Sequence, residues 1–155
     1  MKEVVELLRK NKKTISTMES CTGGFIANEI TNIEGSSEIL KFSAVTYSNE
    51  YKIKMGVSQD ILERYTVYSM ETAKEMSHVI SSFTNSDYGI GVTGKLNRVD
   101  EENPYGEDNI VFINIYDKGN NKDISFTVEA TKSSRKENKG LVCDTVRKNL
   151  LELLK

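Results

Sequence analysis

The sequence predicts an α/β fold in which a mixed sheet is flanked by helices, giving three αβα layers in a single domain. In the first two thirds of the chain, short β-rich runs alternate with segments whose apolar residues recur at helical spacing. Later, two strand-like runs follow each other across a Gly-Asn-Asn turn at 119–121. The 155 residues, 37% of them hydrophobic, suit one domain over residues 1–155.

The elements of the N-terminal part follow from apolar spacing. Val4, Val5, Leu7 and Leu8 mark one face of a first helix, and the run TISTM is typical of a strand. The expected elements are a helix (2–11), a strand (14–18), a helix from Thr22 to about Glu34, a strand (39–47) and a short helix that ends near Gly56.

The C-terminal part is expected to hold three helices and three strands. Ser58 and Ser69 are placed to cap helices over 59–65 and 70–83, because serine side chains accept hydrogen bonds from the first free N–H groups. The further elements are strands at 88–94, 109–117 and 123–130 and a long amphipathic helix at 134–154.

Composition and charge exclude several function classes. The formal net charge of −2 gives no basic face, so we expect no nucleic-acid partner. No apolar run approaches the roughly 20 residues of a membrane helix, and the charged N-terminus is unlike a signal peptide. We therefore expect a cytoplasmic protein without membrane contact.

Cysteine and histidine are scarce. Cys21 and Cys143 are the only cysteines and His78 is the only histidine, so neither a disulfide framework nor a metal site is expected. Any catalytic scheme that requires histidine would depend on His78 alone.

The stretch ESCTGG joins the first strand to the second helix. Ser20, Cys21 and Thr22 followed by Gly23 and Gly24 would present small side chains and free N–H groups at a helix start. Such a turn can bind a phosphate or the oxyanion that forms when a nucleophile attacks a carbonyl. The alternative is a tight turn whose glycines only let the helix approach the sheet.

The stretch VTYSNEYK follows the strand at 39–47. Tyr47, Ser48 and Lys52 could project toward the same cleft, where a buried lysine can serve a serine as its base. The alternative is a half-buried strand residue at Tyr47 and a solvated helix residue at Lys52.

Two further features border the same edge of the sheet. Thr93 and Gly94 end a strand, as Ser20 does, and ligands in α/β sheets bind beyond the carboxyl ends of strands. A polar loop of about a dozen residues follows Gly94, and loops of that length are commonly functional or mobile. A basic cluster at the start of the last helix could receive an anionic substrate; it contains Lys132, Arg135, Lys136 and Lys139.

Together these motifs resemble the C-terminal domain of the CinA family, which includes the bacterial nicotinamide-nucleotide amidases. The resemblance rests on ESCTGG, GSS at 35–37, VTYSNEYK and GVTG at 91–94, in this order, and it runs from about Thr14 to the last helix. It implies a metal-independent hydrolase that converts nicotinamide mononucleotide to nicotinic acid mononucleotide and ammonia, without a cofactor.

The resemblance also implies residue roles. The nucleophile falls on Ser20, and the groups that move its proton fall on Tyr47 and Lys52. The small-molecule nucleotide is expected to contact Cys21, Thr22, Gly23, Gly24, Ser36, Thr93, Gly94 and Arg135. Family likeness further implies a homodimer or a higher homo-oligomer.

The chain departs from the family pattern after Gly94. KLNRVDEEN replaces an Ile-Ala-Gly-Pro stretch and a glycine-rich loop, and Ser134 stands where the family often has aspartate. Lys95, Arg98 and Arg135 offer another route to a phosphate. Two alternatives therefore stay open: a non-catalytic member that binds a nucleotide or a partner, and an amidase for a different carboxamide.

Overall fold

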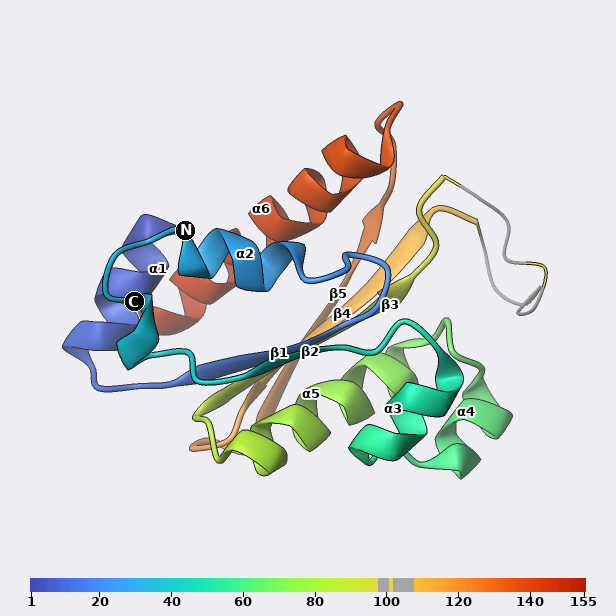
Figure 1. The fold of residues 1–155 in the computed structure, drawn as a ribbon, viewed down its shortest axis with the longest axis horizontal. Helices are drawn as coiled ribbons and strands as arrows, with labels where there is room; N and C mark the ends of the chain where they lie inside the picture. Colours follow the sequence, from blue (N-terminus) through green and yellow to red (C-terminus); the bar gives the residue numbers. More distant parts are fainter. Residues whose placement is uncertain (98–100, 102–107) are drawn as a thin grey trace.

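A computed structural model describes residues 1–97, 101 and 108–155, and its strands form one sheet in the order β2-β1-β3-β4-β5 (Figure 1). The first three are parallel to one another, whereas β4 and β5 extend the sheet as an antiparallel hairpin. The strands are β1 (Ile15–Glu19), β2 (Ser43–Val45), β3 (Tyr88–Gly94), β4 (Ile110–Asp117) and β5 (Lys122–Glu129). The predicted mixed sheet is confirmed.

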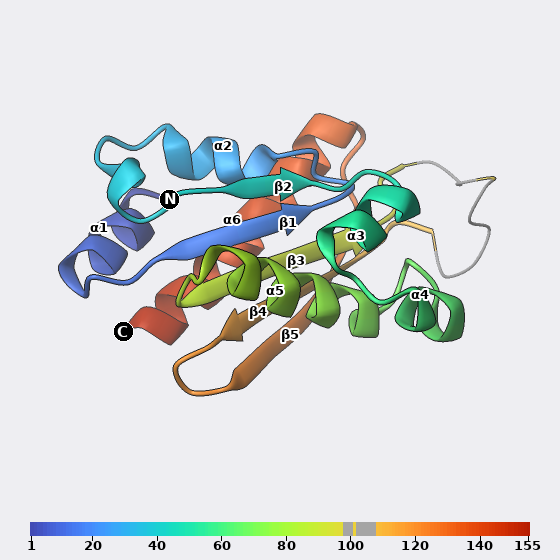
Figure 2. The same cartoon turned by 60° about the horizontal axis from the view of Figure 1, so that its bottom comes forward.

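Helices cover both faces of this sheet, so the predicted three layers are also confirmed (Figure 2). One face carries α1 (Lys2–Lys10), α2 (Phe25–Thr31) and α6 (Arg135–Leu154). The other carries α3 (Asn49–Met55), α4 (Gln59–Tyr65) and α5 (Met70–Thr84). Within the described part of the chain, no helix is both long enough and apolar enough to span a membrane.

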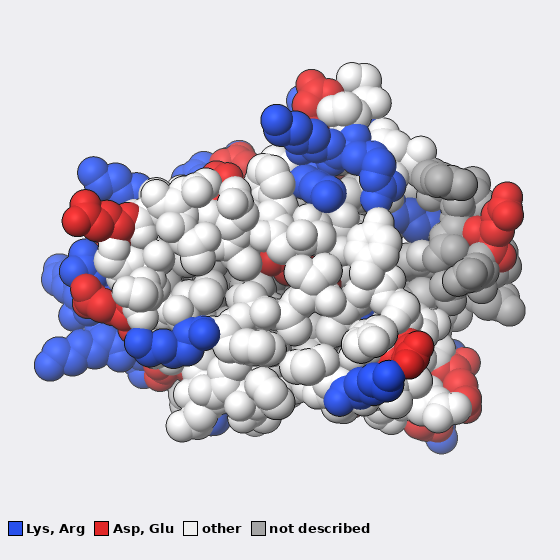
Figure 3. Space-filling model, in the orientation of Figure 1, with Lys and Arg blue, Asp and Glu red and all other residues white. Residues whose placement is uncertain are grey.

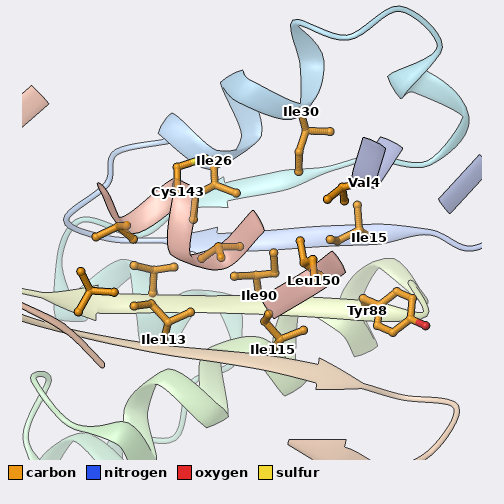
Figure 4. Packing of buried hydrophobic residues seen from close by; sticks show 14 of the residues in the cluster. Val4, Ile15, Ile26, Ile30, Tyr88, Ile90, Ile113, Ile115, Cys143 and Leu150 are labelled. Carbon is orange, nitrogen blue, oxygen red and sulfur yellow. The ribbon is translucent and has the colours of Figure 1, made fainter. Parts of the chain in front are cut away.

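The larger hydrophobic core lies between the sheet and the α1, α2 and α6 layer (Figure 4). Val4, Ile26, Ile30, Cys143 and Leu150 approach it from the helices and meet strand residues such as Ile90 and Ile113. Removal of this apolar surface from water is the main favourable contribution to the fold.

The second core, beneath α5, is smaller and depends on two glycines. Met18, Ala44, Met76 and Ile80 belong to it. A Cβ on Gly89 or Gly91 would lie 2.1 Å from a carbonyl oxygen of α5, so only glycine lets the helix backbone approach β3 this closely. Gly89 and Gly91 of β3 therefore form the surface against which α5 packs.

Two predicted boundaries differ from the structure. The second helix begins at Phe25 rather than Thr22, because Gly23 and Gly24 have φ angles of 60° and 90° and form a left-handed turn. Of the strand expected at 39–47, only 43–45 forms. Its first residues close a 3₁₀ turn instead, in which the N–H groups of Ile39 and Leu40 donate to Ser36 O.

The helix caps agree in part with the sequence. Ser69 caps α5 as predicted, since Thr72 N donates to its Oγ atom. Ser58 stands at the N-cap of α4, but its side chain accepts no capping bond and its N–H donates to Glu75. Ser134 caps α6 in a reciprocal pair with Glu137.

Candidate functional site

Ser20 lies directly beyond the carboxyl end of β1, in the turn that leads to α2. Its N–H donates to Val92 O at 3.0 Å, which continues the pairing with β3, and its carbonyl accepts from Gly23 N at 2.9 Å. The two bonds hold the residue between sheet and turn. Its side chain is consequently buried at a defined position.

Glu19, which sequence reasoning did not single out, organises this turn. Its carboxylate is fully buried and accepts hydrogen bonds from the hydroxyls of Thr17 and Thr22 and from the N–H groups of Ile26 and Ala27, at 2.7 to 3.0 Å. The positive end of α2 stabilises such a carboxylate. An acidic residue followed by a threonine and a helix start was the available sequence signal.

The Glu19 carboxylate decides what the turn can bind. It takes the N–H groups of Ile26 and Ala27, which a phosphate at this helix start would need, and it places a negative charge beside them. An oxyanion would instead be held by N–H groups earlier in the turn, those of Cys21, Thr22 and Gly24, since the Gly23 N–H bonds the Ser20 carbonyl. Of the two ligands expected at this turn, the geometry favours the oxyanion.

Lys52 reaches Ser20 from α3, the helix that follows β2. Ser48, which was also expected near the cleft, caps this helix: its Oγ atom accepts a hydrogen bond from Tyr51 N. Lys52 is only 1% exposed, and its Nζ atom lies 3.2 Å from Ser20 Oγ and 2.7 Å from Thr46 O. The structure thus brings two of the three predicted catalytic side chains into hydrogen-bond contact.

Tyr47 lies elsewhere. Its side chain is exposed, and its hydroxyl accepts a hydrogen bond from Arg135 Nη2 at 3.1 Å. In the described residues it makes no hydrogen bond with Ser20 or Lys52. Arg135 Nη1 donates to Leu96 O, so its guanidinium joins the chain after β2 to the chain after β3. Since β1 lies between these strands, and the Arg135 charge acts on the Cys21 thiol, Arg135 lies near the turn that carries Ser20.

Cations surround this end of the sheet. Figure 3 shows Lys and Arg gathered where α6 begins, above a broad face with little charge. Lys139 Nζ lies 3.4 Å from the position that a Cβ would take on Gly23. Lys95 is buried after β3, with Asp108 at 3.4 Å and the Tyr68 ring at 5.0 Å.

Most of the loop at 95–103, Arg98 included, lies outside the described residues.

Four predicted binding residues, Cys21, Thr22, Gly23 and Gly24, follow Ser20 in the turn. Burial raises the pKa of the Cys21 thiol to about 12, although Arg135 and Lys52 counteract this effect. Cys21 is therefore a neutral neighbour and no thiolate nucleophile. Thr22 donates its hydroxyl to Glu19, while Gly23 and Gly24 supply the left-handed backbone of the turn.

The other predicted binding residues are dispersed. Thr93 lies beside Ser20 on β3, but its hydroxyl donates to Val67 O at 2.8 Å, and Gly94 pairs with Val111 of β4. Ser36 lies at the opposite end of the sheet. It shares a 3₁₀ turn with Ile39, whose carbonyl oxygen accepts from Ile15 N at the start of β1. The structure does not bring Ser36 together with Ser20.

His78 lies far from this site. It bonds Asp123 of β5 at 2.7 Å and stacks on Tyr116, at the sheet edge opposite β2. Among the described residues, no group of three His, Cys, Asp or Glu side chains is placed to hold a metal ion.

Comparison with curated proteins points to one family. The model of the CinA C-terminal domain matches residues 1–154. A CinA-like protein of Endomicrobium trichonymphae is 40% identical over 149 residues, which cover 94% of this chain and 34% of that protein. A putative competence-damage inducible protein of Clostridium beijerinckii is 45% identical over 119 residues, 75% of this chain and 28% of its own. The chain spans about a third or less of these relatives.

Solved structures share the fold. A CinA superfamily protein from Klebsiella pneumoniae superposes with a TM-score of 0.89 at 20% identity, covering 99% of this chain and 94% of its own. The competence/damage inducible protein CihA from Agrobacterium tumefaciens gives 0.78 at 28% identity, covering 98% and 94%. With the family model matching nearly every residue, the chain belongs to the CinA C-terminal domain family.

Proposed function

We propose that the chain is a metal-independent amidohydrolase that deamidates nicotinamide mononucleotide to nicotinic acid mononucleotide and ammonia. The observation that carries the proposal is the 3.2 Å contact between Lys52 Nζ and Ser20 Oγ, with both side chains buried. A serine hydroxyl is a weak nucleophile until a base takes its proton, and a lysine in its neutral form can be that base. Burial in general disfavours the charged form of a lysine.

The reaction needs two displacements at one carbon. Ser20 Oγ attacks the carboxamide carbon while its proton passes to Lys52 Nζ, and N–H groups of the turn after Ser20, other than that of Gly23, hold the oxyanion. Lys52 then gives the proton to the leaving nitrogen, so that ammonia departs and an ester to Ser20 remains. A water molecule, deprotonated by Lys52, cleaves this ester and restores the Ser20 hydroxyl.

The mononucleotide as substrate is supported by charge at the same end of the sheet. The Arg135 guanidinium lies near the turn and Lys139 lies beside Gly23, and both side chains suit a phosphate group. Tyr47 holds Arg135 through its hydroxyl. In this proposal Tyr47 therefore acts on the substrate's phosphate end rather than on the Ser20 proton.

Ammonia release from nicotinamide mononucleotide and from a panel of simple carboxamides tests the proposal. Wild type should release ammonia from the mononucleotide, and Ser20→Ala should reduce the rate at least a thousandfold. Activity in Ser20→Ala equal to wild type would exclude Ser20 as the nucleophile. Turnover of other amides alone would indicate a different carboxamide substrate.

A non-catalytic role is the second candidate, favoured by the loop after Gly94, which lacks the family's glycines. It predicts no turnover of any amide together with tight nucleotide binding. Calorimetric titration of the same protein with nicotinamide mononucleotide distinguishes this outcome from the first.

A further inference from the structure

The Thr46 hydroxyl is buried without a partner. Thr46 is 2% exposed, and its Oγ1 atom is the one buried side-chain N or O atom in the described residues that has no hydrogen bond. Buried hydroxyls are usually paired, because an unpaired one loses its hydration without compensation. The unpaired Thr46 hydroxyl therefore calls for a functional explanation.

Thr46 occupies the same row as Ser20. Glu19 pairs with Val45 on one side and with Val92 on the other, and the next residues of the three parallel strands are Thr46, Ser20 and Thr93. Two backbone bonds extend the pairing to this row: Thr46 N to Glu19 O at 2.9 Å and Ser20 N to Val92 O at 3.0 Å. Three hydroxyl-bearing residues thus lie side by side.

These side chains face the α5 side of the sheet. Met18 and Ala44 pack in the core beneath α5, and side chains two positions apart in a strand point to the same face. Ser20 and Thr46 therefore continue that face, where Lys52 meets Ser20. Thr93 in this row donates to Val67 O, whereas Thr46 Oγ1 stays unpaired.

The position of Lys52 decides which part of a substrate would lie near Thr46. Lys52 Nζ contacts Ser20 Oγ and the carbonyl oxygen of Thr46, so it lies on the β2 side of Ser20. The leaving nitrogen must come within reach of Nζ to receive its proton. It consequently leaves on the side where Thr46 lies.

We propose that Thr46 Oγ1 accepts a hydrogen bond from the carboxamide nitrogen of the substrate and so holds the leaving group beside Lys52. The inference rests on the proposed amidase function. A primary carboxamide has two N–H donors, and a hydroxyl oxygen can accept one of them while Nζ approaches the nitrogen. Substrate binding thereby supplies the partner that the fold does not.

Ammonia release by Thr46→Val and Thr46→Ser tests this contact, with the exposed Thr127→Val as the matched control. Valine keeps the shape and removes the acceptor, so kcat should fall about tenfold, the worth of one hydrogen bond. Serine keeps the hydroxyl and should stay within about threefold of wild type. Thermal unfolding without substrate should leave the midpoint of Thr46→Val unchanged or raised, because no bond in the fold is lost.

A lower midpoint in Thr46→Val, with kcat unchanged, would assign the hydroxyl to the fold and overturn the inference. Wild-type kcat in Thr46→Val, in a protein that Ser20→Ala inactivates, would overturn the inference and leave the proposed function standing. Absence of ammonia release by wild type from every carboxamide would overturn both.

Discussion

Lys52 Nζ lies 3.2 Å from Ser20 Oγ, although the two residues are 32 positions apart in the chain. Ser20 follows β1, and Lys52 lies on the helix that follows β2. Because β1 and β2 pair in parallel, their carboxyl ends meet at one edge of the sheet. Figure 2 shows both arrowheads pointing toward α3. The parallel pairing therefore creates the contact on which the proposed chemistry depends.

Replacement of Lys52 by methionine should stop turnover while preserving the fold, since methionine keeps most of the aliphatic chain. Loss of a general base predicts a fall in kcat of at least about a hundredfold. Lys54→Met is the matched control on the same helix, because Lys54 is exposed and bonds only Glu50 and the Tyr51 ring among described contacts. Similar kcat in both variants would contradict the role of Lys52.

Tyr47→Phe separates two roles for this residue. The structure joins its hydroxyl to Arg135, so its loss should raise KM for the mononucleotide about tenfold and change kcat less than about threefold. Tyr51→Phe, on an exposed tyrosine of α3, should change neither. A fall in kcat of a hundredfold at constant KM would instead make Tyr47 a proton-transfer group, as the family resemblance implies.

Glu19→Gln should destabilise the protein by about 2 kcal/mol, because an amide NH₂ would face donors that now bond a carboxylate oxygen. Urea unfolding measures the loss. Glu152→Gln, on the exposed side of α6, should stay within about 0.5 kcal/mol of wild type. An unchanged midpoint in Glu19→Gln would show that the four bonds of this carboxylate contribute little.

The two cysteines should resist alkylation in the folded protein. Burial raises the pKa of both Cys21 and Cys143 to about 12, so their thiols stay protonated at pH 8. Iodoacetamide labelling followed by mass spectrometry should find neither modified in native protein and both modified in urea. The folded-state pKa of Cys21 exceeds the ordinary value of 9.0, so the folded protein holds the thiol proton more tightly than the unfolded chain does. The stability that neutral Cys21 contributes is therefore present below pH 9 and is lost between pH 9 and about 12.

We expect the Asp87 carboxylate, which accepts hydrogen bonds from Lys13 and Thr14 just before β1, to stabilise the fold in an acid-sensitive way. Burial raises the pKa of its carboxyl, but hydrogen bonds from Lys13 and from the backbone and side chain of Thr14 outweigh this and hold the pKa below its usual value. The contribution is present at neutral pH and is lost as the pH falls below about 4. Unfolding midpoints of Asp87→Asn should be lower than wild type at pH 7 and should converge with it in acid.

Most elements could be predicted because the apolar pattern of each is local. Strands such as TISTM and YGIGVTG and the cap at Ser69 follow from residue type and spacing alone. The strand expected at 39–47 forms only at 43–45, because Ser36 O accepts from the N–H groups of Ile39 and Leu40 in a turn. Ser36 belongs to GSS, one of the motifs on which the family resemblance rests, yet it lies at the other end of the sheet from Ser20.

The sequence by itself determined the fold class, the family, and Ser20 and Lys52 as candidate residues, since these depend on patterns within segments and on the order of motifs along the chain. Only the tertiary structure decided that Lys52 meets Ser20, that Tyr47 turns to Arg135, and that Glu19 and Thr46 belong to the same end of the sheet. The reason is physical: a hydrogen bond or an unpaired buried hydroxyl depends on neighbours that parallel strand pairing brings from distant parts of the chain.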